Sequence, residues 1–213
     1  MGEGKIKLVC FDLNKTLIEE NTWLDLNLAM GMTKEEDDFL LHLFEEKVIS
    51  YRLWTKILCQ IYKKRGKSFY GDIYRVICRY SYKEGAKEVI EYFKNKGYEV
   101  ALISGAMNLL VEKVAGELEI NYYEANNIFI FDKKDYLKDI IVIGDDELVK
   151  VHHLQSFCRK LGISLKECAC IGDGDNDRLL FEETGHGVTF KGSRLENSAW
   201  KVIKNLEDLK EIF

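Results

Sequence analysis

The feature that most constrains the fold is a repeated alternation between short apolar runs and longer segments with helical spacing. The runs that have the length and composition of buried strands are 5–11, 98–104, 120–125, 167–172 and 187–190. The segments with helical spacing between them are 85–97, 107–118, 149–162 and 176–184. Strands separated by helices of this length form a mostly parallel sheet with helices on both faces. The sequence therefore predicts an α/β fold with a doubly wound, mostly parallel, Rossmann-like sheet.

Two segments depart from this alternation. The runs 128–131 and 139–143 flank the polar sequence DKKDY, and they predict a β-hairpin. Residues 18–83 contain no convincing strand, and their apolar residues recur at helical spacing. We therefore expect an α-helical cap domain at 18–83, inserted into a core domain that is formed by residues 1–17 and 84–213.

Charge is segregated within the predicted cap. Residues 19–47 carry nine acidic residues and two Lys, whereas residues 51–83 carry nine Lys or Arg, one Asp and eight aromatic residues. Three interpretations fit this pattern: two solvated faces that attract each other, a surface that steers an anionic substrate, or a surface on which single-stranded nucleic acid stacks. The net charge of −5 argues against a general nucleic-acid-binding protein.

Composition limits the class of protein further. The 213 residues are 46% hydrophobic and 31% charged, which predicts a globular chain with a substantial core. No stretch approaches the roughly 20 apolar residues that a membrane span needs, and the first apolar run is too short for a signal peptide. The six cysteines show no CxxC pair and no His at metal-binding spacing. We expect buried, reduced thiols, no membrane partner and a cytoplasmic location.

Polar residues gather where the predicted strands end, which is where open α/β sheets place their active sites. They are Asp12, Asn14 and Thr16 after the first strand, Ser104 and Gly105 after the second, Lys150 at the start of a helix, and GDGDND (172–177) after the fourth strand.

In this order, the four segments resemble the motifs of the haloacid dehalogenase-like (HAD) hydrolases, and within them the phosphoserine-phosphatase-like branch. DLNKT is similar to the first motif, DxDxT, at every position but one, and ALISGA is similar to the second. Lys150 fits the third motif, and IGDGDND fits the fourth. The predicted helical insertion has the position of that branch's cap, so the resemblance covers nearly the whole chain. It implies a Mg²⁺-dependent phosphatase that acts on a small phosphorylated metabolite, similar to phosphoserine.

The residue types fit this chemistry on physical grounds. Phosphoryl transfer needs a nucleophile in line with the leaving group and positive charge around the phosphate. Asp12 is the candidate nucleophile, because a carboxylate can attack phosphorus and form an aspartyl-phosphate. Mg²⁺ prefers oxygen ligands, which Asp12 and Asp173 can supply. Asp177 lies four residues further on, on the same side of the helical turn, and completes the predicted metal site.

Three groups are expected to hold the phosphate. The hydroxyl of Ser104 and the amide of Gly105 can donate hydrogen bonds to phosphate oxygens, and Lys150 can stabilise charge on both the phosphate and Asp12. Lys150 is therefore predicted to act in phosphate binding and in catalysis.

Asn14 is the one position at which the first motif departs from the family pattern. The resemblance implies that the backbone carbonyl of this residue binds Mg²⁺, and that its carboxyl gives and takes a proton. Asn14 can keep the first role, because a main-chain oxygen does not depend on the side chain. A carboxamide has no proton to exchange near neutral pH, and a positioned acid–base group contributes roughly 10²–10⁴ in rate. We therefore expect a weakened acid–base step.

Three explanations of Asn14 remain open at this point. It can be an engineered substitution, or it can be natural in an enzyme that is slow or whose leaving groups need no proton. Alternatively, the chain can be a catalytically silent phosphate-binding or partner-binding protein on the same scaffold. A receiver domain that is phosphorylated on Asp145 or Asp146 is disfavoured, because this pair follows the predicted hairpin and not the first strand.

Several positions argue against strict specificity for phosphoserine. Relatives that hydrolyse phosphoserine carry an acidic residue at the position of Asn21, and Lys15 and Ala106 also depart from the motifs. Arg52 or Arg65 could hold a substrate carboxylate, although both also fit exposed surface positions. Surface or packing roles are expected for His42, His152, His153 and His186.

Overall fold

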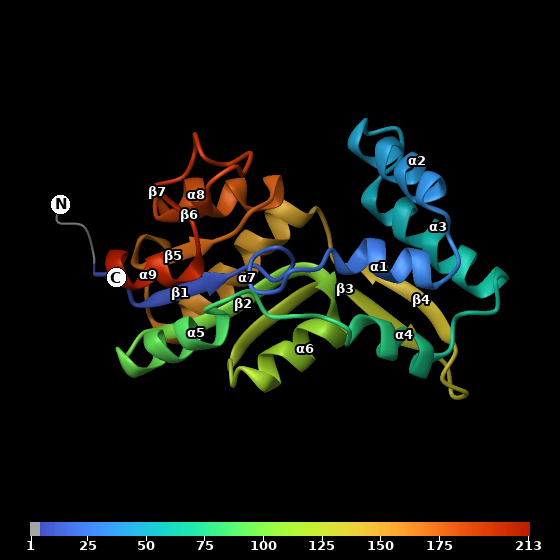
Figure 1. The fold of residues 1–213 in the computed structure, drawn as a ribbon, viewed down its shortest axis with the longest axis horizontal. Helices are drawn as coiled ribbons and strands as arrows, with labels where there is room; N and C mark the ends of the chain where they lie inside the picture. The colour runs from blue at the N-terminus through green and yellow to red at the C-terminus, as the bar shows by residue number, and fades with distance from the viewer. Residues whose placement is uncertain (1–4) are drawn as a thin grey trace.

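A seven-stranded sheet forms the centre of the computed structural model, which describes residues 5–213. The strand order is β4-β3-β2-β1-β5-β6-β7 (Figure 1), and every neighbouring pair is parallel except β3 and β4. The strands are β1 (Leu8–Phe11), β2 (Glu99–Met107), β3 (Tyr122–Phe131), β4 (Leu137–Val142), β5 (Cys168–Ile171), β6 (Gly187–Phe190) and β7 (Lys201–Ile203). The predicted fold class, an α/β fold with a mostly parallel sheet, is confirmed.

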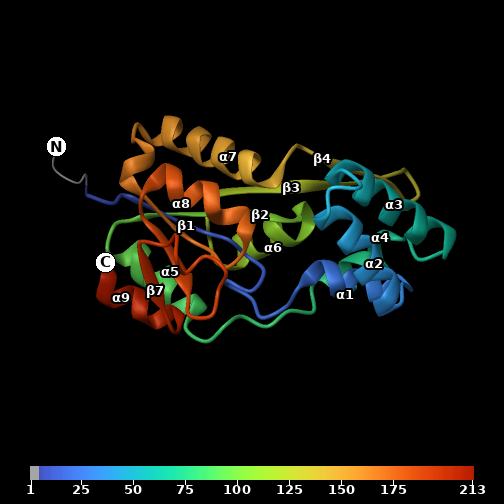
Figure 2. The ribbon, with the colours of Figure 1, turned by 90° about the horizontal axis from the view of Figure 1, so that it is seen from above.

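Helices cover both faces of this sheet (Figure 2). One face is covered by α5 (Ala86–Asn95) and α6 (Asn108–Glu117), with α9 (Leu209–Ile212) beside α5, and the other by α7 (Asp146–Leu161) and α8 (Arg178–Thr184). The central strand β1 is buried along its whole length, because its side chains alternate between these two layers. Val9 and Phe11 pack into one hydrophobic cluster, whereas Leu8 and Cys10 pack into the other.

The strand β3 is longer than the sequence predicts. The predicted strand 120–125 and the first arm of the predicted hairpin, 128–131, form one continuous strand. Its first half pairs with β2 in parallel, and its second half pairs with β4 in the predicted antiparallel hairpin. Asn126 and Asn127 resemble a turn in the sequence, but both side chains are buried and donate hydrogen bonds to backbone carbonyls. The strand β7 and the helix α9 were not predicted.

Four helices lie between β1 and α5, in the segment predicted to be a helical cap. They are α1 (Thr22–Ala29), α2 (Lys34–Glu45), α3 (Tyr51–Lys64) and α4 (Tyr70–Ile77). Thr33 and Ser50 accept hydrogen bonds from the first turns of α2 and α3, which fixes where these helices begin. The chain enters and leaves the segment side by side, because Ile18 and Tyr82 form a β-bridge.

The β3–β4 hairpin supports these inserted helices. The amide of Tyr70 donates to the carbonyl of Asp135, and the amide of Leu137 donates to the carbonyl of Ser68. The helix α3 packs along β4. The hairpin belongs to the predicted core segment but packs with the predicted cap. The division into two domains therefore remains a prediction. Residues 1–4 of the predicted core segment lie outside the described residues.

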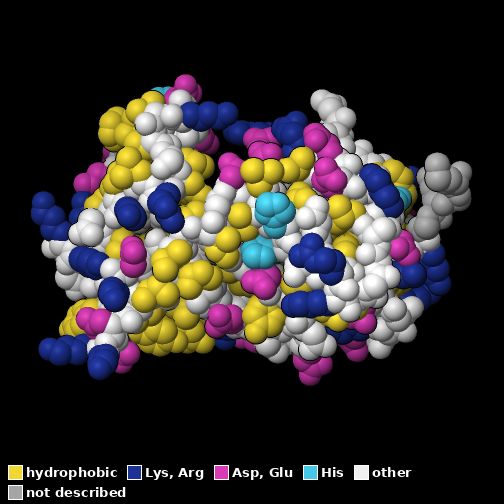
Figure 3. All heavy atoms as spheres, turned by 180° about the vertical axis from the view of Figure 1, so that it is seen from behind, with side chains coloured by type: hydrophobic (Ala, Val, Ile, Leu, Met, Phe, Trp, Pro, Cys, Tyr) yellow, Lys and Arg dark blue, Asp and Glu magenta, His cyan; other side chains and the backbone are white. Residues whose placement is uncertain are grey.

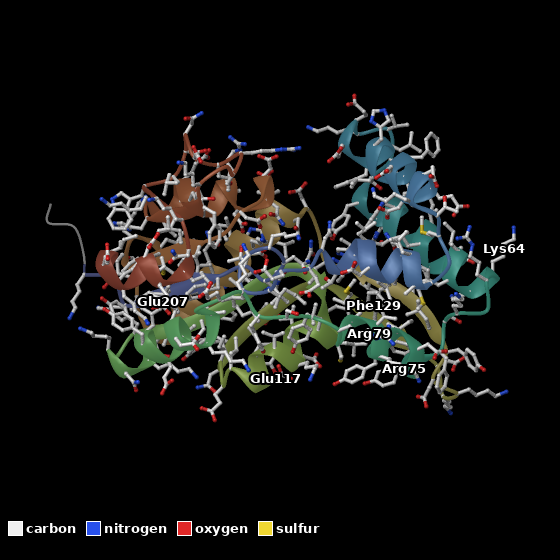
Figure 4. All side chains as sticks on the ribbon, viewed as in Figure 1. Lys64, Arg75, Arg79, Glu117, Phe129 and Glu207 are labelled. Atoms are coloured by element: carbon white, nitrogen blue, oxygen red, sulfur yellow. The ribbon has the colours of Figure 1, made fainter. Side chains whose placement is uncertain are left out.

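Two basic side chains of the inserted segment, Lys64 and Arg75, lie away from the ends of the central strands (Figure 4). Figure 4 shows Lys64 at the outer end of α3 and Arg75 at the outer rim beside α4. Arg65 forms a two-armed ion pair with Glu36, at 2.7 and 2.9 Å, which links the basic α3 to the acidic α2. The contact agrees with the interpretation of two charged faces that attract each other.

The opposite face of the molecule carries apolar side chains over the inserted helices and β4 (Figure 3). Exposed apolar residues of α3 and of the chain in and just after β4 include Leu53, Ile141 and Ile143. Within residues 5–213, no helix is both long enough and apolar enough to cross a membrane.

The buried face of α3 generates the first testable prediction. Leu58 is fully buried, whereas Leu53 on the same helix is 46% exposed. We expect Leu58→Ala to lower the free energy of unfolding by about 2–5 kcal/mol, because it leaves a cavity in the core. Urea unfolding followed by circular dichroism measures the change. Leu53→Ala is the matched control and should change it by about 0.5 kcal/mol or less; equal losses would show that α3 does not pack as described.

Candidate functional site

The ends of three strands bring the predicted site residues to one edge of the sheet. Phe11 of β1 lies opposite Leu102 of β2 and Ile171 of β5. Asp12 therefore leaves β1 at the level where β2 continues to Ser104 and β5 ends before the loop that carries Asp173. The amide of Asp12 donates to the carbonyl of Ile171 at 2.9 Å, which fixes the two strand ends relative to each other.

Lys150 reaches this edge from the helix α7 and is buried, with an exposed fraction of 1%. Its Nζ lies 2.9 Å from Oδ1 of Asp12 and 2.7 Å from Oδ1 of Asp177. Burial alone would lower the pKa of Lys150, but the carboxylates of Asp12, Asp177 and Asp146 together hold it well above its usual value. Lys150 is therefore a fixed positive charge next to the candidate nucleophile.

Three carboxylates converge beside Lys150. One oxygen from each of Asp12, Asp173 and Asp177 lies within 4.8 Å of the other two. Burial raises the pKa of Asp177 to about 7 against the opposing effect of Lys150, and burial together with Asp12 raises the pKa of Asp173 to about 6. The single positive charge of Lys150 does not neutralise the three carboxylates when all of them are ionised.

These carboxylates fit a hard divalent cation. Oδ2 of Asp177 is buried and has no hydrogen-bond partner among the residues that the structure describes. A Cβ at Gly172 would lie only 2.2 Å from this same oxygen, so the close approach of the carboxylate to the end of β5 requires glycine. Clustered carboxylate oxygens with spare acceptor capacity are the donors that Mg²⁺ prefers.

Ser104 and Gly105 lie towards the end of β2, where its pairing with β3 is irregular. Ser104 is buried, and its Oγ accepts a hydrogen bond from the amide of Ala106 at 3.2 Å. The carbonyl of Gly105 accepts hydrogen bonds from Nε1 of Trp23 at 3.1 Å and from Nδ2 of Asn127 at 2.7 Å. The inserted helix α1 and the strand β3 therefore both hold this part of β2 in place.

Asn14 faces the inserted helices. Its Oδ1 accepts a hydrogen bond from Oγ1 of Thr22, the first residue of α1, at 2.9 Å. The amide therefore connects the loop after β1 to the start of α1. Thr16 lies in the same loop and is buried. Its Oγ1 lies 3.4 Å from Oδ1 of Asp173.

Asp146 is a further carboxylate at the site that the sequence did not predict. It accepts hydrogen bonds from Nδ2 of Asn126 at 2.7 Å and from Nδ2 of Asn176 at 2.6 Å. A Cβ at Gly105 would lie 2.4 Å from Oδ2 of Asp146, so this carboxylate lies directly against Gly105 in β2. Asp146 lies four residues before Lys150, on the same side of α7, and this spacing in the sequence could have predicted that it lies near the site.

A cleft of about 1210 Å³ opens beside these residues. Its walls come from α1, α2, α3 and the loop between α2 and α3 on one side, and from the start of α7, the turn before α8 and Arg194 on the other. Asp146 and Asn176 line both this cleft and the site. These two residues therefore connect the cleft to the carboxylate cluster.

The two arginines considered from the sequence lie outside the cleft lining. Arg52 is exposed, and Arg65 is paired with Glu36. Asn21 does line the cleft, and it also caps the helix α1 by accepting a hydrogen bond from the amide of Leu24.

The histidines and cysteines have no contact with the carboxylate cluster in the hydrogen-bond pattern of residues 5–213. His42 and His152 are exposed, His153 is half-buried, and the ring of His186 packs against Trp200 at 5.1 Å. All six cysteines are free, and all but Cys78 are buried, as predicted.

The buried Lys150 generates a prediction on stability. We expect Lys150→Met to lower the free energy of unfolding by about 3–5 kcal/mol at pH 8, because Asp12 and Asp177 lose their positive partner. The loss should be smaller at pH 5, since burial raises the pKa of Asp177 to about 7 and the carboxyl then takes a proton. Urea unfolding at the two pH values checks this. Lys160→Met, an exposed position on the same helix, is the control and should show little change at either pH.

Comparisons with known proteins agree with this geometry. Residues 6–183 match the family model of the haloacid dehalogenase-like hydrolases. The phosphoserine phosphatase of Methanocaldococcus jannaschii is 27% identical over 216 residues, which covers 99% of this chain and 97% of the relative. The phosphoserine phosphatase of Campylobacter jejuni subsp. doylei is 26% identical over 211 residues, which covers 97% of this chain and 98% of the relative.

The solved structures extend the likeness to three dimensions. A structure described as a phospho-aspartyl intermediate analogue of phosphoserine phosphatase superimposes with a TM-score of 0.80 at 26% sequence identity. The superposition covers 98% of this chain and 99% of that one. Because the family model spans most of the chain and the folds agree over its length, the chain belongs to the haloacid dehalogenase-like hydrolases.

Proposed function

We propose that this protein is a phosphomonoester hydrolase that works through an aspartyl-phosphate on Asp12. The observation that carries the proposal is the contact of the buried Lys150 with both Asp12 and Asp177, beside the third carboxylate of Asp173. A carboxylate nucleophile next to a fixed cation and a metal-type donor set is the equipment that phosphoryl transfer requires. The relatives named phosphoserine phosphatase support the same reaction class.

The proposed reaction has two displacements at phosphorus. In the first, an oxygen of Asp12 forms a bond to phosphorus while the bond from phosphorus to the ester oxygen breaks, and the leaving alcohol takes a proton from solvent. In the second, a water oxygen forms a bond to phosphorus while the bond from phosphorus to the Asp12 oxygen breaks. The water gives up a proton to solvent, inorganic phosphate is released, and the carboxylate of Asp12 is restored. The sum is the hydrolysis of a phosphomonoester to an alcohol and phosphate.

The metal ligands in this proposal are side-chain oxygens of Asp12, Asp173 and Asp177 and the backbone carbonyl of Asn14. When bound there, Mg²⁺ would neutralise the negative charge of the phosphate and of the carboxylates. The unpartnered oxygen of Asp177 and the raised pKa values of Asp173 and Asp177 support this assignment.

The phosphate-binding groups in this proposal are Ser104, Gly105 and Lys150. An ammonium group has three N–H donors, and Lys150 directs two of them at Asp12 and Asp177. The third is left for a phosphate oxygen. The hydroxyl of Ser104 and the amide of Gly105 would bind the other oxygens.

Asn14 favours a second candidate function, a phosphate-binding protein with little or no turnover. Its side chain is neutral and accepts a hydrogen bond from Thr22, so it has no proton to transfer to a leaving group. The metal and phosphate ligands do not depend on that proton. Binding is therefore expected to persist even where the chemical step is slow.

Restoring the carboxyl group at position 14 separates the two functions. We expect Asn14→Asp to raise the turnover of p-nitrophenyl phosphate or phosphoserine at least tenfold, since a positioned acid–base group contributes roughly 10²–10⁴. A phosphate-release assay over a panel of small phosphomonoesters measures it. Asp12→Ala in the same background is the control and should abolish turnover. No gain from Asn14→Asp would favour the phosphate-binding protein.

The metal site can be tested without turnover. We expect Mg²⁺ with BeF₃⁻ to raise the melting temperature, because a ligand that binds only the folded state stabilises it. Asp173→Asn should abolish this shift. The metal-free variant should also melt higher than the parent at pH 8, because the pKa of Asp173 is raised to about 6 and its ionised form is unfavourable in the fold.

That gain should shrink as the pH falls from about 6 towards 4, where the carboxyl of Asp173 is protonated in the parent as well. Differential scanning fluorimetry at several pH values measures both effects. Glu182→Gln, an exposed position on α8, is the matched control and should leave the Mg²⁺ shift intact. A shift that survives in Asp173→Asn would contradict the assigned ligands.

A further inference from the structure

Four aromatic side chains form one wall of the cleft, namely Trp23, Phe44, Tyr51 and Trp54. They contact one another: the rings of Trp23 and Trp54 are 4.9 Å apart, and those of Phe44 and Tyr51 are 5.3 Å apart. Trp54 joins the two pairs, because its ring stacks on that of Tyr51 at 5.7 Å. The cleft is therefore bordered by a continuous aromatic surface.

Acidic residues dominate the charged part of the same cleft. They are Asp37, Glu45, Asp145, Asp146, Glu147 and Asp175, and the basic residues that line it are Lys47 and Arg194. Arg194 contacts Asp175 at 3.4 Å and is largely exposed. None of the nine Lys or Arg residues of segment 51–83 lines the cleft. The interpretation of a surface that steers an anionic substrate therefore has no support at this cleft.

The aromatic wall is continuous with the proposed phosphate site. Trp23 Nε1 and the hydroxyl of Tyr51 both donate to the carbonyl of Gly105, at 3.1 and 3.4 Å. On the other side, Asp146 lies against Gly105 and also lines the cleft. A phosphate bound at Gly105 would thus direct its ester substituent between the aromatic rings and the acidic side chains.

We infer that this cleft selects phosphomonoesters whose leaving group carries a positive charge and no carboxylate, such as a primary amine or a quaternary ammonium. The inference rests on the proposed phosphatase function. Cations are attracted to the faces of Trp, Tyr and Phe, and the surrounding carboxylates add to that attraction. A carboxylate on the substrate would meet mainly acidic residues, because Arg52 and Arg65 do not line the cleft and its basic residues are Lys47 and Arg194, of which Arg194 contacts Asp175. The reaction is the hydrolysis of an aminoalkyl or ammonioalkyl phosphate to the alcohol and phosphate.

The first experiment compares three substrates that differ in the charge of the leaving group. The leaving group of phosphocholine carries a positive charge, and that of glycerol 3-phosphate is uncharged. The leaving group of phosphoserine carries both an ammonium and a carboxylate. With Mg²⁺, on both the parent chain and Asn14→Asp, we expect kcat/KM for phosphocholine to exceed the other two at least tenfold. Equal values, or a preference for phosphoserine, would overturn the inference and leave the phosphatase proposal standing.

Two variants in the cleft lining, each with a control outside it, test whether residues of α2 cause the preference for phosphocholine. Phe44→Leu keeps an apolar side chain but removes the aromatic face, and Glu45→Gln removes a charge at nearly constant size. Each should raise KM for phosphocholine several-fold and leave KM for glycerol 3-phosphate unchanged. The controls Phe39→Leu and Glu46→Gln alter exposed positions outside the cleft lining and should change neither value. A change of the same size in both substrates would show loss of structure and count against the inference.

Tryptophan fluorescence gives a second measurement that needs no turnover. Trp23 and Trp54 line the cleft, whereas Trp200 packs against His186. With Mg²⁺ present, we expect phosphocholine to change the emission at a lower concentration than glycerol 3-phosphate does, and Phe44→Leu to weaken this response. Loss of all turnover together with preferential phosphocholine binding would reject the phosphatase and keep the cation site. Identical titrations would reject the cation site.

Discussion

The ion pair of Lys150 with Asp12 and Asp177 is the interaction on which the rest of the site depends. A buried ammonium is stable only where nearby carboxylates offset the loss of its hydration. Here the Oδ1 atoms of Asp12 and Asp177 both lie within 2.9 Å of Nζ of Lys150. The three residues come from α7, from the end of β1 and from the start of α8. The contact therefore forms only when these three elements are packed in their places in the fold. The excess negative charge that remains makes the cluster suitable for a divalent metal ion.

Much of this arrangement could be predicted from the sequence, because it follows from a general property of parallel sheets. The carboxyl ends of neighbouring parallel strands meet at one edge, so Asp12, Ser104 and Asp173 were expected together once their strands were recognised. Lys150 was expected from its place in the series of motifs. The contacts of Asp146 could not be predicted in the same way, since they depend on Asn126 and Asn176, which are distant in sequence.

The inserted segment shows the limit of reasoning from charge counts. The basic composition of residues 51–83 favoured several functions, but composition does not say which face of a helix carries the charge. In the structure, α3 presents Tyr51 and Trp54 to the cleft, while Lys64 lies at its outer end (Figure 4). The direction of a helix face is decided by packing against β4 and its neighbouring helices, and this is information that only the assembled fold contains.

The hydrogen bond from Thr22 to Asn14 has a consequence for how the loop after β1 is joined to the first inserted helix. A carboxylate at this junction would form a charge-assisted contact whose strength varies with acidity and with ionic strength. A hydroxyl and an amide carry no net charge, so this hydrogen bond between the loop after β1 and the first inserted helix does not depend on the ionisation of residue 14. The departure from the family motif thus replaces a group that could titrate at this contact with one that cannot.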